Sequence, residues 1–349
     1  MSGTSMDGID AALLRTDGQT VTETGLASTT PYDSDLRNAI RGILGGVGAV
    51  DDVERRVTEA HAAAVTGLLA AANLSAADID IIGFHGHTIL HRPQEGRTWQ
   101  IGDGGLLARL TGIDVVCDLR SNDVAKGGEG APIVPVYHRA LCGDLPRPLA
   151  IVNIGGVANV TWIGMDDEML AFDTGPGNGL LDEWVDSHIG EPFDKGGKLA
   201  GAGQSQSDRL VRLLENPYFD QAPPKSLDRI DFDLTALEGL RAADGAATLV
   251  AFTAETIARA KPFLPALPNQ WLVTGGGRHN PTLMAALEDS LGMKVAAVET
   301  VGWNGDALEA QAFAFLAARS LLSLPLTYPG TTGVSAPVTG GRFFAHSLK

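Results

Sequence analysis

Hydrophobic positions recur along this chain with two spacings, and the longer spacing predicts amphipathic helices. Val53, Val57, Ala64 and Leu68 share one helix face, and Asp51 stands before them as a candidate N-cap. Similar patterns and capping signals predict helices over 34–44, 104–110, 132–141, 208–214, 246–260 and 307–321, with another starting at Pro281.

Short apolar runs between these helices predict strands. They cover 11–14, 79–84, 99–101, 114–117, 149–154, 160–163, 170–172, 271–273 and 294–298. Several end in glycine-rich turns and alternate with helices, which is typical of an α/β fold. Because strand meanders feed helices near the start and again after residue 149, we expect two similar domains with mixed sheets flanked by helices. We place the first at 1–125 plus 308–349 and the second at 126–307, with the polar, glycine-rich run 118–130 as their junction.

Bulk properties narrow the classes of function. The 349 residues are 44% hydrophobic, which suits a sizeable core, and the net charge of −16 argues against nucleic acid or an anionic membrane as a partner. No apolar run approaches membrane-spanning length and no signal peptide is evident, so we expect a cytoplasmic enzyme. Cys117 and Cys142 stand alone, which argues against a disulfide framework or a structural zinc site.

The stretch from Phe172 to Trp184, FDTGPGNGLLDEW, carries the main candidate chemistry. Asp173 ends a predicted strand, Gly175 and Gly177 make the turn flexible, and Asn178 is a candidate cap for the next helix. A strand-end carboxylate beside a helix N-terminus suits a phosphorylated ligand. The alternative is an ordinary tight turn in which Asp173 is only structural.

Three glycine turns occur beside predicted strands: GTSMDG, DTGPG and TGGG. Neither a P-loop nor a Rossmann fingerprint is present. Three such turns favour one nucleotide held between two domains, with ordinary turn chemistry as the alternative. His85, His87 and His91 include a spacing found in metal sites, but no nearby cysteine or second histidine pair completes one, so packed or hydrogen-bonded histidines are the favoured interpretation.

The motifs together identify a family resemblance. SGTSMDGID, HGHTILHRP, DLRSNDVAKGGEGAPIVP, NIGGVAN, FDTGPGNGLLDEW, PPKS and VTGGGRHNPTLM occur in this order over nearly the whole chain. They resemble the anhydro-N-acetylmuramic acid kinases of the sugar kinase/Hsp70/actin superfamily. The resemblance implies two actin-like (ribonuclease H-like) domains around an ATP cleft. It also implies opening and phosphorylation of 1,6-anhydro-N-acetylmuramic acid, with ATP and Mg²⁺, in peptidoglycan recycling.

The resemblance further implies roles for individual residues. Asp173 matches the catalytic base, and Asp7 is expected to hold Mg²⁺ through water. Arg120, Asn178 and Glu309 are expected to contact the sugar. The residues expected at ATP and its phosphates are Gly3, Thr4, Ser5, Met6, Asp7, Gly8, Ile9, Asp10, Gly155, Gly156, Gly175, Gly275, Gly276, Gly277 and Asn280.

Two departures from the family pattern are visible. Family members usually carry a short apolar strand ahead of GTSMDG, which this sequence lacks, and His87 stands where glutamine is expected. Two other functions stay open at this point: a kinase of the same superfamily acting on another sugar, and a non-catalytic ATP-binding regulator. A homodimer also stays open.

Overall fold

The chain forms two compact units. The computed structural model describes residues 1–3, 6, 8–227, 232 and 234–347. The first unit comprises Met1–Gly143 and Ala307–Lys349, and the second comprises Asp144–Asp306. Residues 126–143 therefore group with the first unit, whereas we had assigned them to the second.

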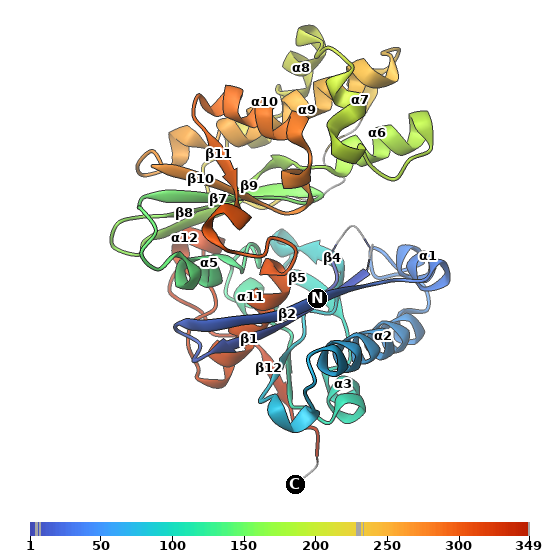
Figure 1. Cartoon of the computed structure of the whole chain (residues 1–349), viewed down its shortest axis with the longest axis vertical. Coiled ribbons are helices and arrows are strands. Elements are labelled where there is room, and N and C mark those ends of the chain that lie inside the picture. Colours follow the sequence, from blue (N-terminus) through green and yellow to red (C-terminus); the bar gives the residue numbers. More distant parts are fainter. Residues whose placement is uncertain (4–5, 7, 228–231, 233, 348–349) are drawn as a thin grey trace. The chain divides into compact units, whose positions relative to one another are not determined.

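The first unit combines short sheets with helices (Figure 1). Its strands are β1 (Gly8–Thr16), β2 (Val21–Pro31), β3 (Ile82–Gly83), β4 (His87–Arg92), β5 (Arg97–Ile101), β6 (Val115–Cys117) and β12 (Arg342–Phe344). Its helices are α1 (Ser34–Gly42), α2 (Val50–Ala71), α3 (Gly104–Thr111), α4 (Ser121–Ala125), α5 (Pro135–Cys142), α11 (Leu308–Leu321) and α12 (Pro329–Thr332). β1 pairs with β2 and β4 with β5, both antiparallel, while β6 lies between parallel β3 and antiparallel β12.

Strand β3 is packed on both faces. Phe84, which follows it, is buried in a cluster with Ala62 of α2 and Leu107 of α3. On the opposite face, a Cβ added to Gly83 would lie 1.9 Å from the backbone oxygen of Phe313 in α11. Only a glycine therefore lets α11 approach this strand so closely.

The second unit is built on one five-stranded mixed sheet. Its strands are β7 (Leu149–Ile154), β8 (Val157–Ile163), β9 (Met169–Pro176), β10 (Gln270–Thr274) and β11 (Val295–Ala297). Its helices are α6 (Gly179–Ile189), α7 (Lys198–Gly201), α8 (Ser207–Leu213), α9 (Ala242–Ala258) and α10 (Pro281–Leu291). The strand order is β11-β10-β7-β8-β9, in which β7, β8 and β9 form an antiparallel meander and β10 and β11 run parallel to β7.

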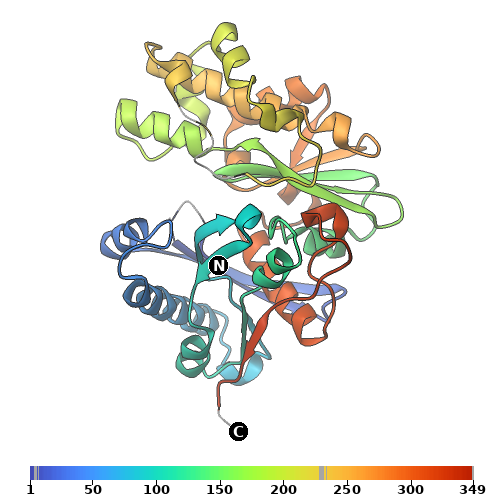
Figure 2. The ribbon, with the colours of Figure 1, turned by 180° about the vertical axis from the view of Figure 1, so that it is seen from behind.

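The helices of the second unit cover one face of this sheet, as both views show (Figures 1 and 2). Val160 and Phe172 on the sheet and Phe252 and Leu287 on the helices belong to one buried cluster. A meander with two parallel strands added beside its first strand is the arrangement of ribonuclease H-like domains. The predicted α/β class with mixed sheets flanked by helices is confirmed.

Several local predictions need correction. Ala49, not Asp51, is the N-cap of α2, and it makes no side-chain capping bond. The apolar run 79–84 yields only the short strand β3, because Ile82 and Gly83 alone pair with β6. Asn178 is the N-cap of α6, but its amide donates to the backbone oxygen of Ile154 instead of capping the helix.

The rest of the helix pattern agrees well with the sequence. Asp33 caps α1 and Asn280 caps α10, each through a side-chain oxygen. Within the described ranges, no helix combines the length and hydrophobicity needed to span a lipid bilayer.

We expect the change Gly83→Ala to destabilise the fold by about 1–3 kcal/mol or more, because the added methyl group overlaps the Phe313 backbone. Urea unfolding followed by circular dichroism measures this loss. Gly67→Ala in α2 is the matched control, since nothing lies within 4 Å of its added Cβ. The control should raise stability by about 0.5–1 kcal/mol. Equal stability of the Gly83→Ala variant and the unmodified protein would contradict the close approach of α11.

Candidate functional site

A row of polar side chains crosses four strands of the second unit. Thr274 of β10 lies opposite Asn153 of β7, Asn153 opposite Asn159 of β8, and Asn159 opposite Asp173 of β9. Directly paired residues project on the same face of a sheet. Because their strand neighbours point into the helix-covered core, this row lies on the face away from α9 and α10.

Asp173 is held by one loop. It is only 8% exposed. Its N–H donates to the backbone oxygen of Lys225 (3.1 Å), and its backbone oxygen accepts from the Tyr218 hydroxyl (2.7 Å). Its carboxylate Oδ2 accepts from the N–H of Leu227 (2.9 Å). The position and direction of the carboxylate are thus fixed by residues 218–227.

The predicted DTGPG turn is wrong, because β9 runs on through Pro176. The short segment between β9 and α6 packs instead against Gly155 and Gly156, at the end of β7. The N–H of Asn178 donates to the backbone oxygen of Gly155 (2.7 Å), and the N–H of Gly177 donates to that of Gly156 (3.0 Å). The Asn178 side chain donates to the backbone oxygen of Ile154 (3.1 Å). Sequence positions 155–156 and 177–178 are therefore one structural feature.

The TGGG turn, at the end of β10, also lies against the end of β7. Gly275 has φ +76°, and a Cβ there would come within 2.4 Å of Asn153 Oδ1 and 2.6 Å of the Ile154 oxygen. A Cβ on Gly277 would lie 2.5 Å from Ile154 Cγ2, and one on Gly276 3.6 Å from Asn178 Nδ2. Glycine is needed for this approach, which brings backbone amides and carbonyls close together.

Two other predicted residues of this unit have identifiable structural contacts. Gly175 faces α9, where an added Cβ would lie 2.7 Å from Thr256 Oγ1. Asn280 is buried, and its side-chain oxygen accepts from the N–H of Leu283 (3.0 Å) at the start of α10. Helix–sheet packing and helix capping account for these contacts, and a role at the nucleotide stays a prediction for both.

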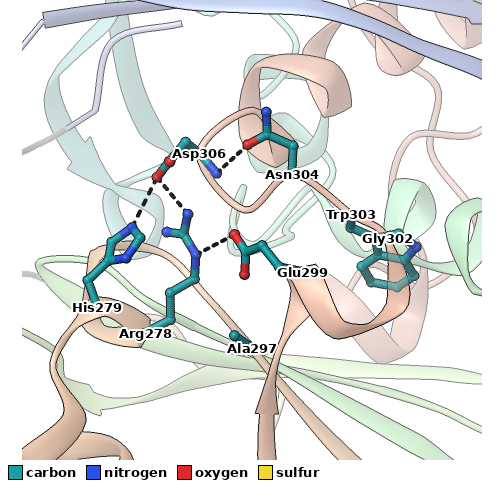
Figure 3. Close-up of a pocket in the computed structure, with 8 residues that line it drawn as sticks. All are labelled: Arg278, His279, Ala297, Glu299, Gly302, Trp303, Asn304 and Asp306. Atoms are coloured by element: carbon teal, nitrogen blue, oxygen red, sulfur yellow. Dashed lines mark hydrogen bonds and ion pairs between the residues drawn. The ribbon is translucent and has the colours of Figure 1, made fainter.

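A cavity of about 590 Å³ lies next to the Gly275–Gly277 turn (Figure 3). Asp173 is not among its lining residues, so the cavity and the carboxylate are separate features of the unit. It is lined by Arg278, His279, Ala297, Glu299, Gly302, Trp303, Asn304 and Asp306.

Arg278 organises one side of this cavity (Figure 3). Its side chain is 2% exposed, and its guanidinium lies 2.8 Å from a carboxylate oxygen of Glu299 and 2.8 Å from one of Asp306. It also donates to the backbone oxygen of Gly275 (2.9 Å). Burial acts to raise the pKa of both carboxyls, but hydrogen bonds, including those from Arg278, outweigh it and lower both pKa values. One buried cation thus joins the glycine turn to the segment before α11.

The opening turn belongs to the first unit and runs into β1. Thr4, Ser5 and Asp7, the expected Mg²⁺ residue among them, lie outside the described residues. The N–H of Met6 donates to the backbone oxygen of Gly3 (3.1 Å), and Met6 and Ile9 are buried against α1 and α2. A Cβ on Gly8 would lie 2.5 Å from the Thr30 oxygen, so β2 closely covers the start of β1.

Three other predicted residues of this unit lie near one another. Desolvation raises the pKa of Glu309 in α11, Arg120 lowers it and Asp10 raises it further. Asp10 also accepts from the Thr29 hydroxyl (2.6 Å). The charges of Arg120 and Asp10 thus act on Glu309 in opposite directions. A role at the sugar stays a prediction for Arg120 and Glu309.

His85 positions Arg120, a contact that we had not foreseen. The guanidinium of Arg120 donates to His85 Nε2 (3.3 Å from Nε) and to the backbone oxygen of Gly130 (2.8 Å). His85 Nδ1 lies 3.1 Å from the Gly86 oxygen and carries the proton, which assigns the tautomer. Burial and the Arg120 charge hold the pKa of His85 well below its usual value, so the ring stays neutral and accepts from arginine.

The three histidines do not form a metal site. His87 pairs with the Ser2 hydroxyl (2.9 Å) and His91 with the Thr98 hydroxyl (3.0 Å), while His85 faces Arg120. No group of histidine, cysteine or carboxylate side chains in the described ranges could hold a metal ion. Burial lowers the pKa of His87 to about 4, so it is a neutral, buried partner of Ser2.

Sequence reasoning also missed Asn153 and Asn159. Both lie in NIGGVAN, from which we selected only the glycines. A signal was present, because a hairpin around Gly155 and Gly156 brings the two asparagines opposite each other on one face.

Comparison with known proteins supplies the family. Residues 1–346 match the family model described as anhydro-N-acetylmuramic acid kinase. Two proteins named anhydro-N-acetylmuramic acid kinase are similar to this chain over nearly their whole length. The one from Paramagnetospirillum magneticum is 59% identical over 98% of this chain and 97% of its own. The one from Rhodospirillum rubrum is 53% identical over 99% and 92%.

We expect Arg278→Met to lower the free energy of unfolding by about 1.5–3 kcal/mol, because it removes charge-assisted hydrogen bonds from a buried position. Asp306→Asn should cost less than about 1 kcal/mol, since the Asp306 side chain is 69% exposed and Arg278 keeps Glu299 as a partner. Urea unfolding curves compare the two variants. Equal losses would show that the buried guanidinium is not the centre of this network.

Proposed function

Because this chain belongs to the anhydro-N-acetylmuramic acid kinase family, we propose that it phosphorylates 1,6-anhydro-N-acetylmuramic acid with ATP. Water opens the 1,6-anhydro ring and the γ-phosphoryl group passes to O6, giving N-acetylmuramate 6-phosphate and ADP. We place the reaction in the cytoplasm, where ATP is available, as a step of peptidoglycan recycling.

The single observation that carries the chemistry is the fixed carboxylate of Asp173. In the proposed reaction it takes a proton from water as the water oxygen bonds to the anomeric carbon. The bond from that carbon to O6 breaks, O6 attacks the γ-phosphorus, and ADP leaves. The hydrogen bond from Leu227 orients one carboxylate oxygen without neutralising it, so the group can still accept a proton.

The glycine turns at 155–156 and 275–277, which both lie at the end of β7, support nucleotide binding. Backbone amides of Gly156 and of the 275–277 turn would hold phosphate oxygens. The cavity beside Arg278 is large enough for the adenosine end. This assignment gives a role to the two glycine turns that lie beside the start of α6 in the second unit.

Magnesium fits this site only as a companion of the nucleotide. The described residues contain no carboxylate cluster that would bind the ion by itself. Mg²⁺ on a nucleotide keeps several waters and needs one or two carboxylates besides phosphate. Asp10 and Asp7 are our candidates, the second reaching the ion through water. When bound, the ion would neutralise charge on the transferring phosphate.

Arg120 and Glu309 are proposed to recognise the sugar. Arg120 would bind the carboxylate of the lactyl group, with His85 and the Gly130 oxygen fixing its guanidinium. Glu309 would accept a hydrogen bond from a hydroxyl group of the sugar through its carboxyl oxygens. In the second unit, Asn178 is the third candidate, through its side-chain oxygen.

The decisive experiment measures ADP release with ATP and either 1,6-anhydro-N-acetylmuramic acid or N-acetylmuramic acid. We expect release with the anhydro sugar alone. Asp173→Asn should still bind ATP in calorimetry but lose at least ~100-fold in turnover, because the base is removed and the shape kept.

Asp289→Asn is the control for this experiment, since it makes the same change on the exposed side of α10 and should leave turnover unchanged. Near-normal turnover of Asp173→Asn would remove Asp173 from the role of base. A stronger response to another sugar would assign a different substrate.

We expect Arg120→Ala to raise the KM for the anhydro sugar by about 10- to 100-fold, the loss typical of a charged hydrogen bond. The KM for ATP should change far less. Steady-state kinetics with each substrate varied in turn give both constants. Equal increases in the two constants would mean that Arg120 serves the phosphates or the junction between the units.

A further inference from the structure

Lys225 is a buried cation that the mechanism above does not use. It is 6% exposed and lies on the loop that holds Asp173. Its ammonium is 4.5 Å from the ring centre of Tyr218, 5.0 Å from that of Phe263 and 5.7 Å from that of Phe172. Three aromatic rings within about 6 Å of one ammonium form a cation–π box.

The ammonium also joins the two ends of the 218–227 loop. It donates to the backbone oxygen of Tyr218 (2.9 Å) and lies within 3.5 Å of that of Phe219. These residues belong to the 3₁₀ helix η4 (Pro217–Asp220), at the other end of the loop. Lys225 therefore ties together the two parts of the chain that contact Asp173.

The same residues make the contacts that fix Asp173. The Tyr218 hydroxyl donates to its backbone oxygen, the Lys225 oxygen accepts from its N–H, and the Leu227 N–H donates to its carboxylate. Phe172, one wall of the aromatic box, is its neighbour in β9. The Lys225 side chain therefore contacts Tyr218 and Phe172, of which the first bonds to Asp173 and the second adjoins it in the chain.

We propose that Lys225 is a positioning residue for Asp173, whose charged ammonium holds the 218–227 loop in the arrangement that aims the carboxylate. This inference rests on the proposed function, because it assigns the same reaction a further residue. Lys225 touches neither substrate nor nucleotide in this proposal. It acts through hydrogen bonds and ring contacts, so its removal should lower kcat more than it changes either KM.

The charge on Lys225 depends on pH within an accessible range. Desolvation lowers its pKa to about 8, and the nearby Asp220 carboxylate opposes this. Among the described residues, the Tyr218 phenol on η4 is another titratable group whose ring contacts the ammonium. Below pH 8 the ammonium is charged and the box is intact, whereas above pH 8 it loses its charge and with it the cation–π attraction.

The test compares Lys225→Met, Lys225→Arg and the unmodified protein in the ADP-release assay from pH 6 to pH 10. We expect kcat of the unmodified protein to fall above pH about 8. Lys225→Met should lose ~10- to 100-fold in kcat at pH 7, with both KM values nearly unchanged, and should lack the alkaline fall. Lys225→Arg stays charged and should regain part of kcat while shifting the alkaline fall to higher pH.

Lys261→Met is the matched control. Lys261 also lies in the second unit, and its ammonium donates to two backbone oxygens at the end of α10, those of Ser290 and Leu291. It should lower thermal stability and leave kcat and the pH profile unchanged. Thermal unfolding of all variants distinguishes a variant that no longer folds from a folded variant in which the Asp173 carboxylate is misplaced.

Two outcomes distinguish this inference from the proposed function. If the unmodified protein releases no ADP with the anhydro sugar, the proposed function fails. If it is active and Asp173→Asn is not, the proposed function stands. A Lys225→Met variant with normal kcat and an unchanged pH profile would then overturn the role of Lys225. A folded variant with lower stability and normal kcat would show that the residue is only structural.

Discussion

The register of β10, β7, β8 and β9 is the constraint on which the second unit depends. It sets Thr274, Asn153, Asn159 and Asp173 in one row. A slip of one residue in any strand would turn these polar groups into the core and expose apolar neighbours such as Phe172. The burial of the helix-covered face therefore fixes the chemistry of the opposite face.

The same constraint explains the glycines. The carboxyl ends of β7 and β10 are adjacent, so the turns that follow them meet, and their backbones approach within the space of a Cβ. Gly275 satisfies both the positive φ and the contact with Asn153. Close packing of turns leaves backbone polar groups concentrated at one edge, which is a general way to bind phosphate without many cations. That is consistent with a chain of net charge −16.

Much of this arrangement could be predicted from the sequence, because periodicity and glycine turns report on local structure. The strands of the second unit and the caps of α1 and α10 were of this kind. The expectation that Asp173 ends a strand was wrong, because β9 continues through Pro176. The boundary between the two units could not be predicted in this way. Residues 126–130 have the composition of a hinge, but buried Asp123 accepts from the N–H of Gly130 (2.7 Å) and the hydroxyl of Thr332 (2.6 Å). A contact across about two hundred residues of chain leaves no local signal.

Lys225 shows the same limit at the site itself. Its neighbours Phe172, Tyr218 and Phe263 are spread along the chain, and a lysine after two prolines is ordinarily expected to be exposed. Burial of the ammonium is tolerated because ring faces and backbone oxygens replace water around it. Displacing the ammonium from these rings and oxygens costs free energy, so its contacts restrict the movement of the 218–227 loop. In the proposed mechanism Asp173 removes a proton from one water molecule. That role needs a rigid loop, since a small error in the position of the carboxylate costs more than a small change in its basicity.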